Sequence, residues 1–137
     1  MLNMLYEVCQ TGGQFRGVLY SHFPGEHSEP SIVTAVGLSF ERMTITIRAV
    51  ADDDTLSVSA TPVAAETDEV LVDWTHSSPW AECVGREATW AWLLRNQQGY
   101  TDGVRFEFRS SNEPAAAIVE LIVIASKIEI FTSTRCS

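Results

Sequence analysis

Histidine and carboxylate side chains gather around one proline-bounded loop, and together they are the groups that a divalent metal site uses. His22 and His27 lie at and inside the segment 22–30, which also carries Glu26 and Glu29. Neither an HxH nor an HExxH spacing is present, and such sets are common in polar loops without any metal. The sequence therefore predicts a solvated loop, with no metal and no other cofactor.

A second group of side chains could support nucleophilic or calcium chemistry. Cys83 adjoins Glu82 and follows His76, so a base and a carboxylate lie near the thiol in sequence. A lone cysteine on a short amphipathic segment is more typical of core packing, and no GxSxG elbow or phosphate-binding glycine loop is present. The acidic residues 52–54 lack the rest of a calcium loop and suit a turn. We predict no catalytic residue, which disfavours an enzyme.

Polar and aromatic side chains meet in residues 97–102, which we call the hairpin tip. The candidate binding residues there are Gln97, Gln98, Tyr100 and Asp102. Binding residues are often found on loops that a rigid scaffold holds, and this composition suits recognition. The alternative is that the amides satisfy the backbone of the turn and that Asp102 caps the returning strand.

The net charge of −9 is concentrated in residues 52–87, which we call the acidic segment. It carries nine acidic side chains, with Arg86 as its one basic residue. Such a field opposes binding to nucleic acid and to anionic membranes, and it favours a basic protein partner. The candidate contacts are Glu66, Asp68 and Glu69. The alternative is that the charge only keeps the protein soluble.

Cysteine usage and hydropathy bear on the cellular compartment. The three cysteines are an odd number without a CxxC spacing, which indicates reduced thiols in the cytoplasm. No apolar run approaches the roughly 18 residues that span a bilayer. The first ten residues lack the positive charge of a secretory signal. These features predict a cytoplasmic protein that does not enter a membrane.

The candidate binding residues of the hairpin tip are positioned by a hairpin over residues 87–109. Trp90 and Trp92 alternate with smaller residues on its first side, and Phe106 and Phe108 alternate with charged residues on its second. This period of two is typical of strands with one face on a core. We predict that the four rings are buried and that the hairpin tip points outward.

The rest of the chain reads as strands with short helical segments. Residues 1–10 carry an apolar helical stripe that Gly12 and Gly13 terminate, and Ser78 with Pro79 predicts a helix ending at Gly85. The tail, residues 115–132, is predicted as a central strand buried on both faces with a break near residues 126–127, although a helix suits the same apolar run. The other predicted strands cover residues 14–23, 32–40 (with Gly37 as a candidate bulge), 44–50, 55–60 and 70–74.

Together these elements predict one domain, residues 1–137, of the α+β, mainly β class. Short connectors make the first four strands an antiparallel meander. The whole is expected to form an antiparallel twisted sheet or partial barrel of six to eight strands with one or two short helices.

The hairpin carries a family resemblance. The pattern W-x-W-L-L-x-N-Q-Q-G-Y-x-D-G-x-x-x-E-F, residues 90–108, resembles a motif of a bacterial family of small uncharacterised proteins. The likeness extends loosely to VELIVIAS, residues 119–126. It implies a bacterial origin and no mechanism.

Three functions are therefore open. The leading hypothesis is a non-catalytic cytoplasmic protein-binding module, regulatory or immunity-type, with an acidic surface. The first alternative is a small enzyme or ligand-binding barrel that uses Tyr100, Asp102 and a histidine. The second is a structural homo-oligomer, formed through residues 1–8 or through an open strand edge.

Overall fold

The structure, a computed structural model, describes residues 2–24 and 32–136. Its helices are α1 (Leu2–Thr11) and η1 (Trp80–Glu82), of which η1 is a single 3₁₀ turn. Its strands are β1 (Phe15–Phe23), β2 (Ile32–Phe40), β3 (Thr44–Val50), β4 (Thr55–Ser59), β5 (Val70–Asp73), β6 (Glu87–Arg95), β7 (Thr101–Arg109), β8 (Ala115–Ile124) and β9 (Lys127–Cys136).

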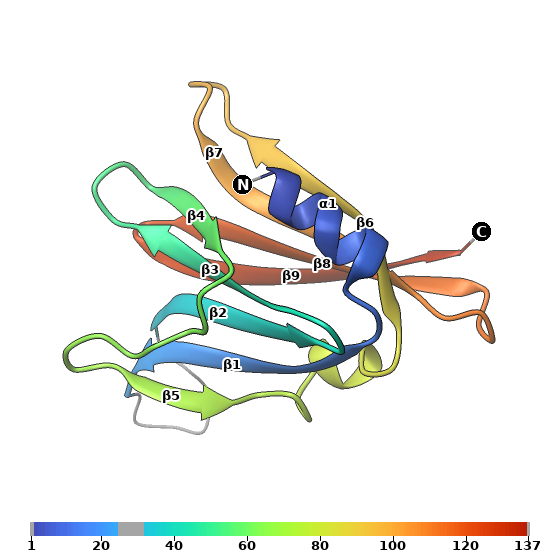
Figure 1. Ribbon diagram of the computed structural model, residues 1–137. Helices are drawn as coiled ribbons and strands as arrows, with labels where there is room; N and C mark the ends of the chain where they lie inside the picture. The colour runs from blue at the N-terminus through green and yellow to red at the C-terminus, as the bar shows by residue number, and fades with distance from the viewer. Residues whose placement is uncertain (1, 25–31, 137) are drawn as a thin grey trace.

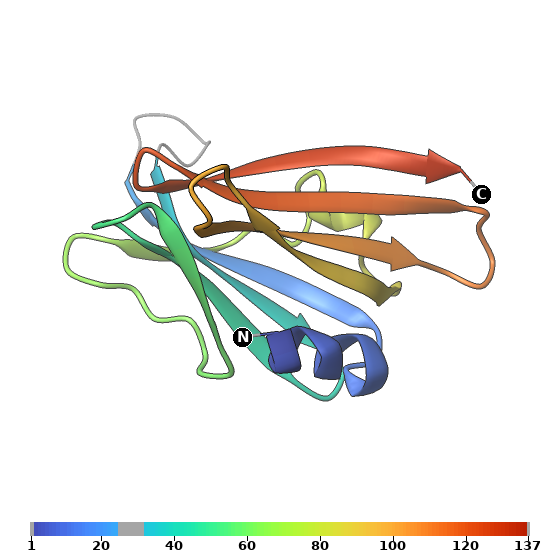
Figure 2. The ribbon, with the colours of Figure 1, turned by 90° about the horizontal axis from the view of Figure 1, so that it is seen from above.

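The strands form two antiparallel sheets that pack face to face (Figures 1 and 2). The first sheet has the order β4-β3-β2-β1-β5 and the second the order β6-β7-β8-β9. The predicted mainly β class and the antiparallel meander of β1 to β4 are confirmed. The structure describes nine strands, one more than the upper end of the predicted range of six to eight. The two sheets remain open at their edges instead of closing into a barrel.

Alternation of side chains explains why both sheets have an apolar inner face. In β3, Ile45 and Ile47 are buried between the sheets, while Thr46 and Arg48 point to the outer side. In β7, Phe106 and Phe108 are fully buried, as predicted. Successive residues of a strand point to opposite faces, so one apolar residue in two suffices to build each half of the core.

The core joins the two sheets through aromatic rings. The Phe15 ring lies 5.6 Å from that of Phe40, 5.8 Å from Trp80 and 5.4 Å from Phe108, measured between ring centroids. The predicted N-terminal helix is confirmed as α1, which contributes buried Leu5 and Val8 to the same cluster. It lies beside β6 (Figure 1).

Residues 60–69, which we call the crossing segment, run over the outer face of the first sheet from β4 at one edge to β5 at the other. Arg48 Nη2 donates a hydrogen bond to the Ala64 carbonyl at 2.7 Å. Gly37 pairs in regular register with Leu19, so it is not a bulge as predicted. A Cβ at Gly37 would come within 2.5 Å of Val63 Cγ1, so the missing side chain lets the crossing segment lie against the sheet.

The prediction that the indole rings of β6 are buried is wrong. Ala88 faces inward opposite Phe108, but the register then shifts, and Ala91 is the next residue to face inward, opposite Phe106. One additional residue at the shift moves the inner face of β6 from even to odd residue numbers. Trp90 and Trp92 consequently point away from the core and stay 60% and 36% exposed.

The predicted helix at residues 78–85 shrinks to η1, and Ser78 does not cap it. The reason lies in the neighbouring strand: the Gly85 N–H donates to the Phe15 carbonyl, and the Phe15 N–H donates to the Arg86 carbonyl. These bonds attach residues 85 and 86 to β1, and Gly85 has a positive φ of 86°, so the chain leaves the helical conformation there. Trp80 Nε1 also donates to the Tyr20 hydroxyl, which places the indole in the core.

The tail forms strands, as favoured, and not a helix. The predicted break is a two-residue turn at Ala125 and Ser126, both with positive φ, that joins β8 to β9. β8 is central within its sheet, between β7 and β9. Its outward residues Ile118 and Ile122 are only half-buried, so burial on both faces was overestimated.

Candidate functional site

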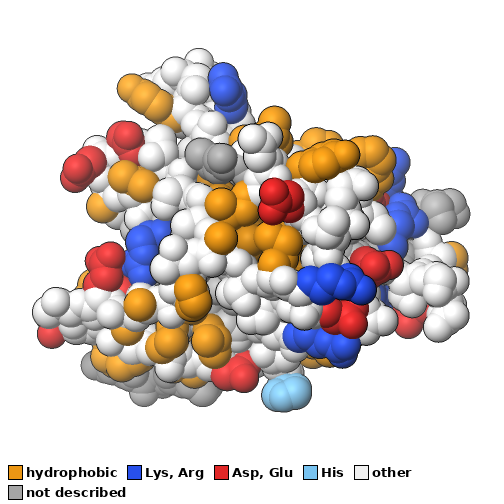
Figure 3. Space-filling view, in the orientation of Figure 1, with side chains coloured by type: hydrophobic (Ala, Val, Ile, Leu, Met, Phe, Trp, Pro, Cys, Tyr) orange, Lys and Arg blue, Asp and Glu red, His pale blue; other side chains and the backbone are white. Residues whose placement is uncertain are grey.

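The outer face of the second sheet carries an unusual set of large apolar side chains, which we call the aromatic face. These residues alternate with the buried ones and point away from the first sheet. Figure 3 shows hydrophobic side chains gathered at the upper margin, beside β6. The apolar members of the aromatic face are Trp90, Trp92 and Leu94 of β6, Ile118, Ile122 and Ile124 of β8, and Phe131 of β9, and the ion pair of Arg105 and Glu120 lies among them.

The two tryptophans on this face are already ordered. Their rings stack with centroids 6.3 Å apart and an interplanar angle of 24°. Arg105 Cζ lies 5.8 Å from the centroid of the Trp92 ring, and Arg105 Nη2 donates to Glu120 Oε1 at 2.8 Å. The ion pair holds the guanidinium beside the indole. Because these side chains are already held in place, they would lose little conformational freedom when a partner covers them.

A buried carboxylate borders the tryptophans on the same face. Glu107, which is 1% exposed, pairs across the strands with Trp90. Arg109 Nη2 lies 2.9 Å from Glu107 Oε1, and Arg135 Nη1 lies 3.9 Å from the same atom. A buried charge needs such compensation, and here two arginines provide it. Arg109 and Arg135 are thereby held on the outer side of the sheet.

Residues 97–100 of the hairpin tip are exposed, as predicted. Asn96 closes the turn, because its Oδ1 accepts hydrogen bonds from the backbone of Gln98 at 2.9 Å and of Tyr100 at 3.2 Å. Gln97, Gln98 and Tyr100 are exposed, whereas Asp102 is half-buried on β7. Asn96 thus satisfies the turn backbone. A binding role for the tip remains a prediction.

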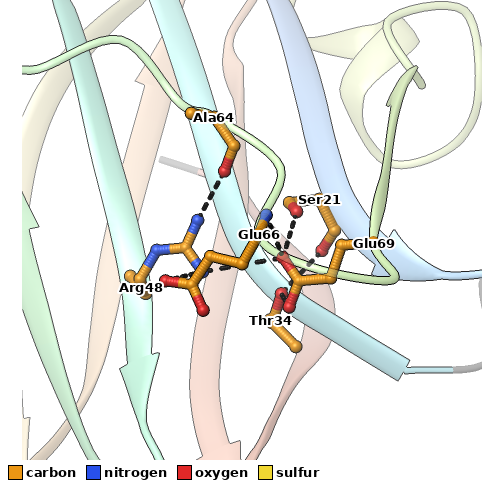
Figure 4. A network of polar contacts seen from close by, with 6 residues as sticks. All are labelled: Ser21, Thr34, Arg48, Ala64, Glu66 and Glu69. Carbon is orange, nitrogen blue, oxygen red and sulfur yellow. Dashed lines mark hydrogen bonds and ion pairs between the residues drawn. The ribbon is translucent and has the colours of Figure 1, made fainter.

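The three acidic candidates lie on the crossing segment, away from the hairpin tip. One of them, Glu69, is enclosed between the crossing segment and the first sheet. Only 5% of the Glu69 side chain is exposed. Its carboxylate accepts hydrogen bonds from Ser21 Oγ at 2.6 Å and Thr34 Oγ1 at 2.8 Å, and it lies 3.7 Å from Arg48 Nη1 (Figure 4). The backbone N–H of Glu66 donates to it at 3.1 Å.

These contacts outweigh the cost of burial for Glu69. Desolvation raises the pKa of its carboxyl, but the bonds from Ser21, Thr34 and Glu66 and the charge of Arg48 together hold that pKa below its ordinary value. Glu69 therefore anchors the crossing segment to β1 and β2. Glu66, with 67% of its side chain exposed, and exposed Asp68 are the members of the trio that reach solvent.

Of the residues considered for a metal site, only His22 lies in the part of the chain that the structure describes. His27, Glu26 and Glu29 lie outside the described residues, and His22 is buried with Nδ1 2.8 Å from the Phe23 carbonyl oxygen. In residues 2–24 and 32–136, no group of three histidine, cysteine or acidic side chains is placed to hold a metal ion.

Cys83 packs in the core, and the protein around it disfavours nucleophilic chemistry. Burial raises the pKa of the Cys83 thiol to about 12, so the reactive thiolate is scarce near neutral pH. His22 lies on β1 of the first sheet and Tyr100 on the hairpin tip of the second. Aromatic rings fill the space between the sheets. The arrangement for a ligand-binding barrel is thus not formed by these residues.

Fold and surface together define a mainly β domain of two packed antiparallel sheets that exposes ordered tryptophans on one of them. Within the described chain, no helix is long and apolar enough to cross a bilayer. The chain belongs to a family of unknown function, DUF6334, whose profile matches residues 6–137. No curated protein and no solved structure matches it.

Proposed function

We propose that this protein is a non-catalytic, cytoplasmic protein-binding module that uses the aromatic face to hold its partner. The observation that carries the proposal is the stacked pair of Trp90 and Trp92, 60% and 36% exposed, with Arg105 beside them. Tryptophan, tyrosine and arginine dominate the energetics of protein interfaces, and large exposed apolar patches often mark contact sites. The hairpin tip continues the same hairpin and adds Tyr100 and two amides for specificity.

The acidic segment complements this face at longer range. A chain of net charge −9 attracts a basic protein and accelerates encounter, while contact at the indoles slows dissociation. A regulatory or immunity-type role, in which the module covers a basic surface of another protein, fits both features. Glu66 and Asp68 serve this attraction, while Glu69 is hydrogen-bonded within the protein.

Replacing both tryptophans by alanine is expected to weaken partner binding at least about 30-fold, since interface hot spots contribute roughly 2 kcal/mol or more. The partner is first captured from the native host with the wild-type chain and identified. The affinity of Trp90→Ala/Trp92→Ala is then measured by calorimetry. Tyr6→Ala, which removes an exposed aromatic ring from α1, is the matched control and should bind normally. Equal affinity of the double variant and the wild type would refute the proposed contact surface.

Reversing the two solvent-exposed charges should act on the association rate. Glu66→Lys/Asp68→Lys is expected to slow association with a basic partner by about tenfold at low salt, with the dissociation rate nearly unchanged. Stopped-flow measurements at two salt concentrations test this, because the difference should vanish near 1 M salt, where charges are screened within about 3 Å. An unchanged association rate at low salt would remove the electrostatic part of the proposal.

A further inference from the structure

Strand β9 is a long and smooth sheet edge whose second half is open, while its first half also lies close to β2 and β3 of the first sheet. All ten of its residues pair with β8 without a register shift, and β9 ends the strand order of the second sheet. Residues 131–135 are exposed without interruption, on both faces of the strand. Figure 2 shows β9 along the margin of the molecule. Sheet edges are commonly protected by proline, bulges, short length or charged side chains; β9 is ten residues long, has neither proline nor bulge, and carries charges of both signs at Lys127, Glu129 and Arg135.

The other described edges differ from β9 in ways that limit pairing. β4 has five residues and β5 four, and β6 contains the register shift and lies beside α1. A short or irregular edge offers few consecutive hydrogen bonds to another strand. β9 is therefore the edge best suited to strand addition among those that the structure describes.

The turn before β9 determines which backbone groups reach the open edge. In a two-residue hairpin the flanking residues, here Ile124 and Lys127, form a hydrogen-bonded pair. Odd-numbered residues of β9 therefore bond to β8. The even-numbered residues direct their N–H and C=O groups outward, namely Ile128, Ile130, Thr132, Thr134 and Cys136.

We propose that β9 pairs antiparallel with β9 of a second copy of this chain, around a two-fold axis at Thr132, to form one continuous eight-stranded sheet. Charge favours this register. Pairing centred on Thr132 places Arg135 opposite Glu129 of the second copy, twice by symmetry, whereas a shift to Phe131 would place Arg135 opposite Lys127. Opposite charges across strands stabilise pairing, and like charges oppose it.

The distribution of net charge also favours this edge. Residues 89–137 carry five basic and five acidic side chains, so the whole net charge of −9 resides in residues 1–88. Two copies therefore repel each other least when they approach through the second sheet. The pairing does not depend on the partner proposed above, although it would join two aromatic faces into one surface.

The test begins with light scattering on the full chain after size exclusion. We expect a dimer at micromolar concentration for the wild type and a monomer for Thr132→Pro. Because the Thr132 N–H points to the open edge, proline removes a bond to the second copy and none to β8. Circular dichroism checks that the variant is folded. A monomeric wild type, or a folded Thr132→Pro that remains dimeric, would overturn the proposal.

Cross-linking tests the register without a destabilising change. In a Cys9→Ser/Cys136→Ser background, Thr132→Cys places two thiols across the axis, with Cα atoms about 5.5 Å apart, within disulfide range. Mild oxidation should then yield a covalent dimer. Ser133→Cys, one residue from the axis and on the other face, is the matched control and should cross-link far more slowly. Equal rates for the two variants would contradict pairing at Thr132.

Discussion

Phe15→Ala is expected to lower the free energy of unfolding by about 3–5 kcal/mol, as large-to-small substitutions of buried aromatic residues do. Phe15 is fully buried, and its ring contacts β2 through Phe40, the second sheet through Phe108, and Trp80 of η1. Loss of this ring would leave a cavity where these three parts meet. Chemical denaturation followed by tryptophan fluorescence measures the effect.

The matched control for this substitution is Tyr6→Ala, which removes an aromatic ring from a position on α1 that is 66% exposed. Surface substitutions of this kind usually change stability by less than about 0.5 kcal/mol. If the two variants lost similar stability, Phe15 would not be the junction of the core that its contacts describe. If Phe15→Ala does not fold, Phe15→Leu provides a milder reduction at the same site.

Glu69→Ala is expected to lower the free energy of unfolding by about 2–4 kcal/mol. The substitution leaves the Ser21 and Thr34 hydroxyls, the Glu66 N–H and Arg48 without their shared acceptor. The crossing segment would lose its attachment to β1 and β2, so proteolysis within residues 60–69 should also accelerate. Urea denaturation and limited proteolysis provide the two measurements.

Glu66→Ala is the matched control, because Glu66 contacts the same Arg48 at 3.3 Å yet is mostly exposed. Exposed ion pairs contribute about 0–1 kcal/mol, so this variant should remain near wild type. The two glutamates thus separate a buried anchor from a surface charge at one arginine. Similar losses from both substitutions would show that the charge near Arg48 matters and the enclosed hydrogen bonds do not.

The contribution of Glu69 to the free energy of unfolding should also depend on pH. The folded state holds the pKa of this carboxyl below its ordinary value of 4.5. A lowered pKa contributes stability that is fully present above the ordinary value and is lost as the pH falls through the folded value. The stability gap between wild type and Glu69→Ala should thus be largest near neutral pH and shrink in acid. A gap that stayed constant below pH 4.5 would argue against this ionised anchor.

Most of the strands were predicted correctly because the patterns that indicate a strand depend only on residues close together in the sequence. Alternating β-branched residues in β3, turn residues before β4 and the paired runs of β6 and β7 each report on a few neighbours. Tail residues 115–132 were ambiguous by periodicity, and their β-branched composition favoured the observed strands. The exposed hairpin tip followed from its glycines and amides.

The remaining features depend on contacts between distant parts of the chain. Ser21 and Glu69 are 48 residues apart, and nothing near either one indicates that the carboxylate will be enclosed. The backbone bonds from Phe15 to Gly85 and Arg86 similarly replace a helix that capping residues predicted. The aromatic face was missed for the same reason, since its exposure depends on the register of β6 against β7.

That register shift has a consequence for how such a surface can change in evolution. Between Ala88 and Trp90 a single residue, Thr89, sets which side of β6 meets solvent. Point substitutions downstream would alter the strength of a contact, whereas regular pairing of Thr89 with Glu107 would shift every later residue of β6 by one position and turn the strand over. Both indoles would then enter the interior, and Ala91 and Leu93 would become the outer surface. The chemistry displayed by this sheet is therefore encoded by the position of one unpaired residue as much as by the identity of the side chains.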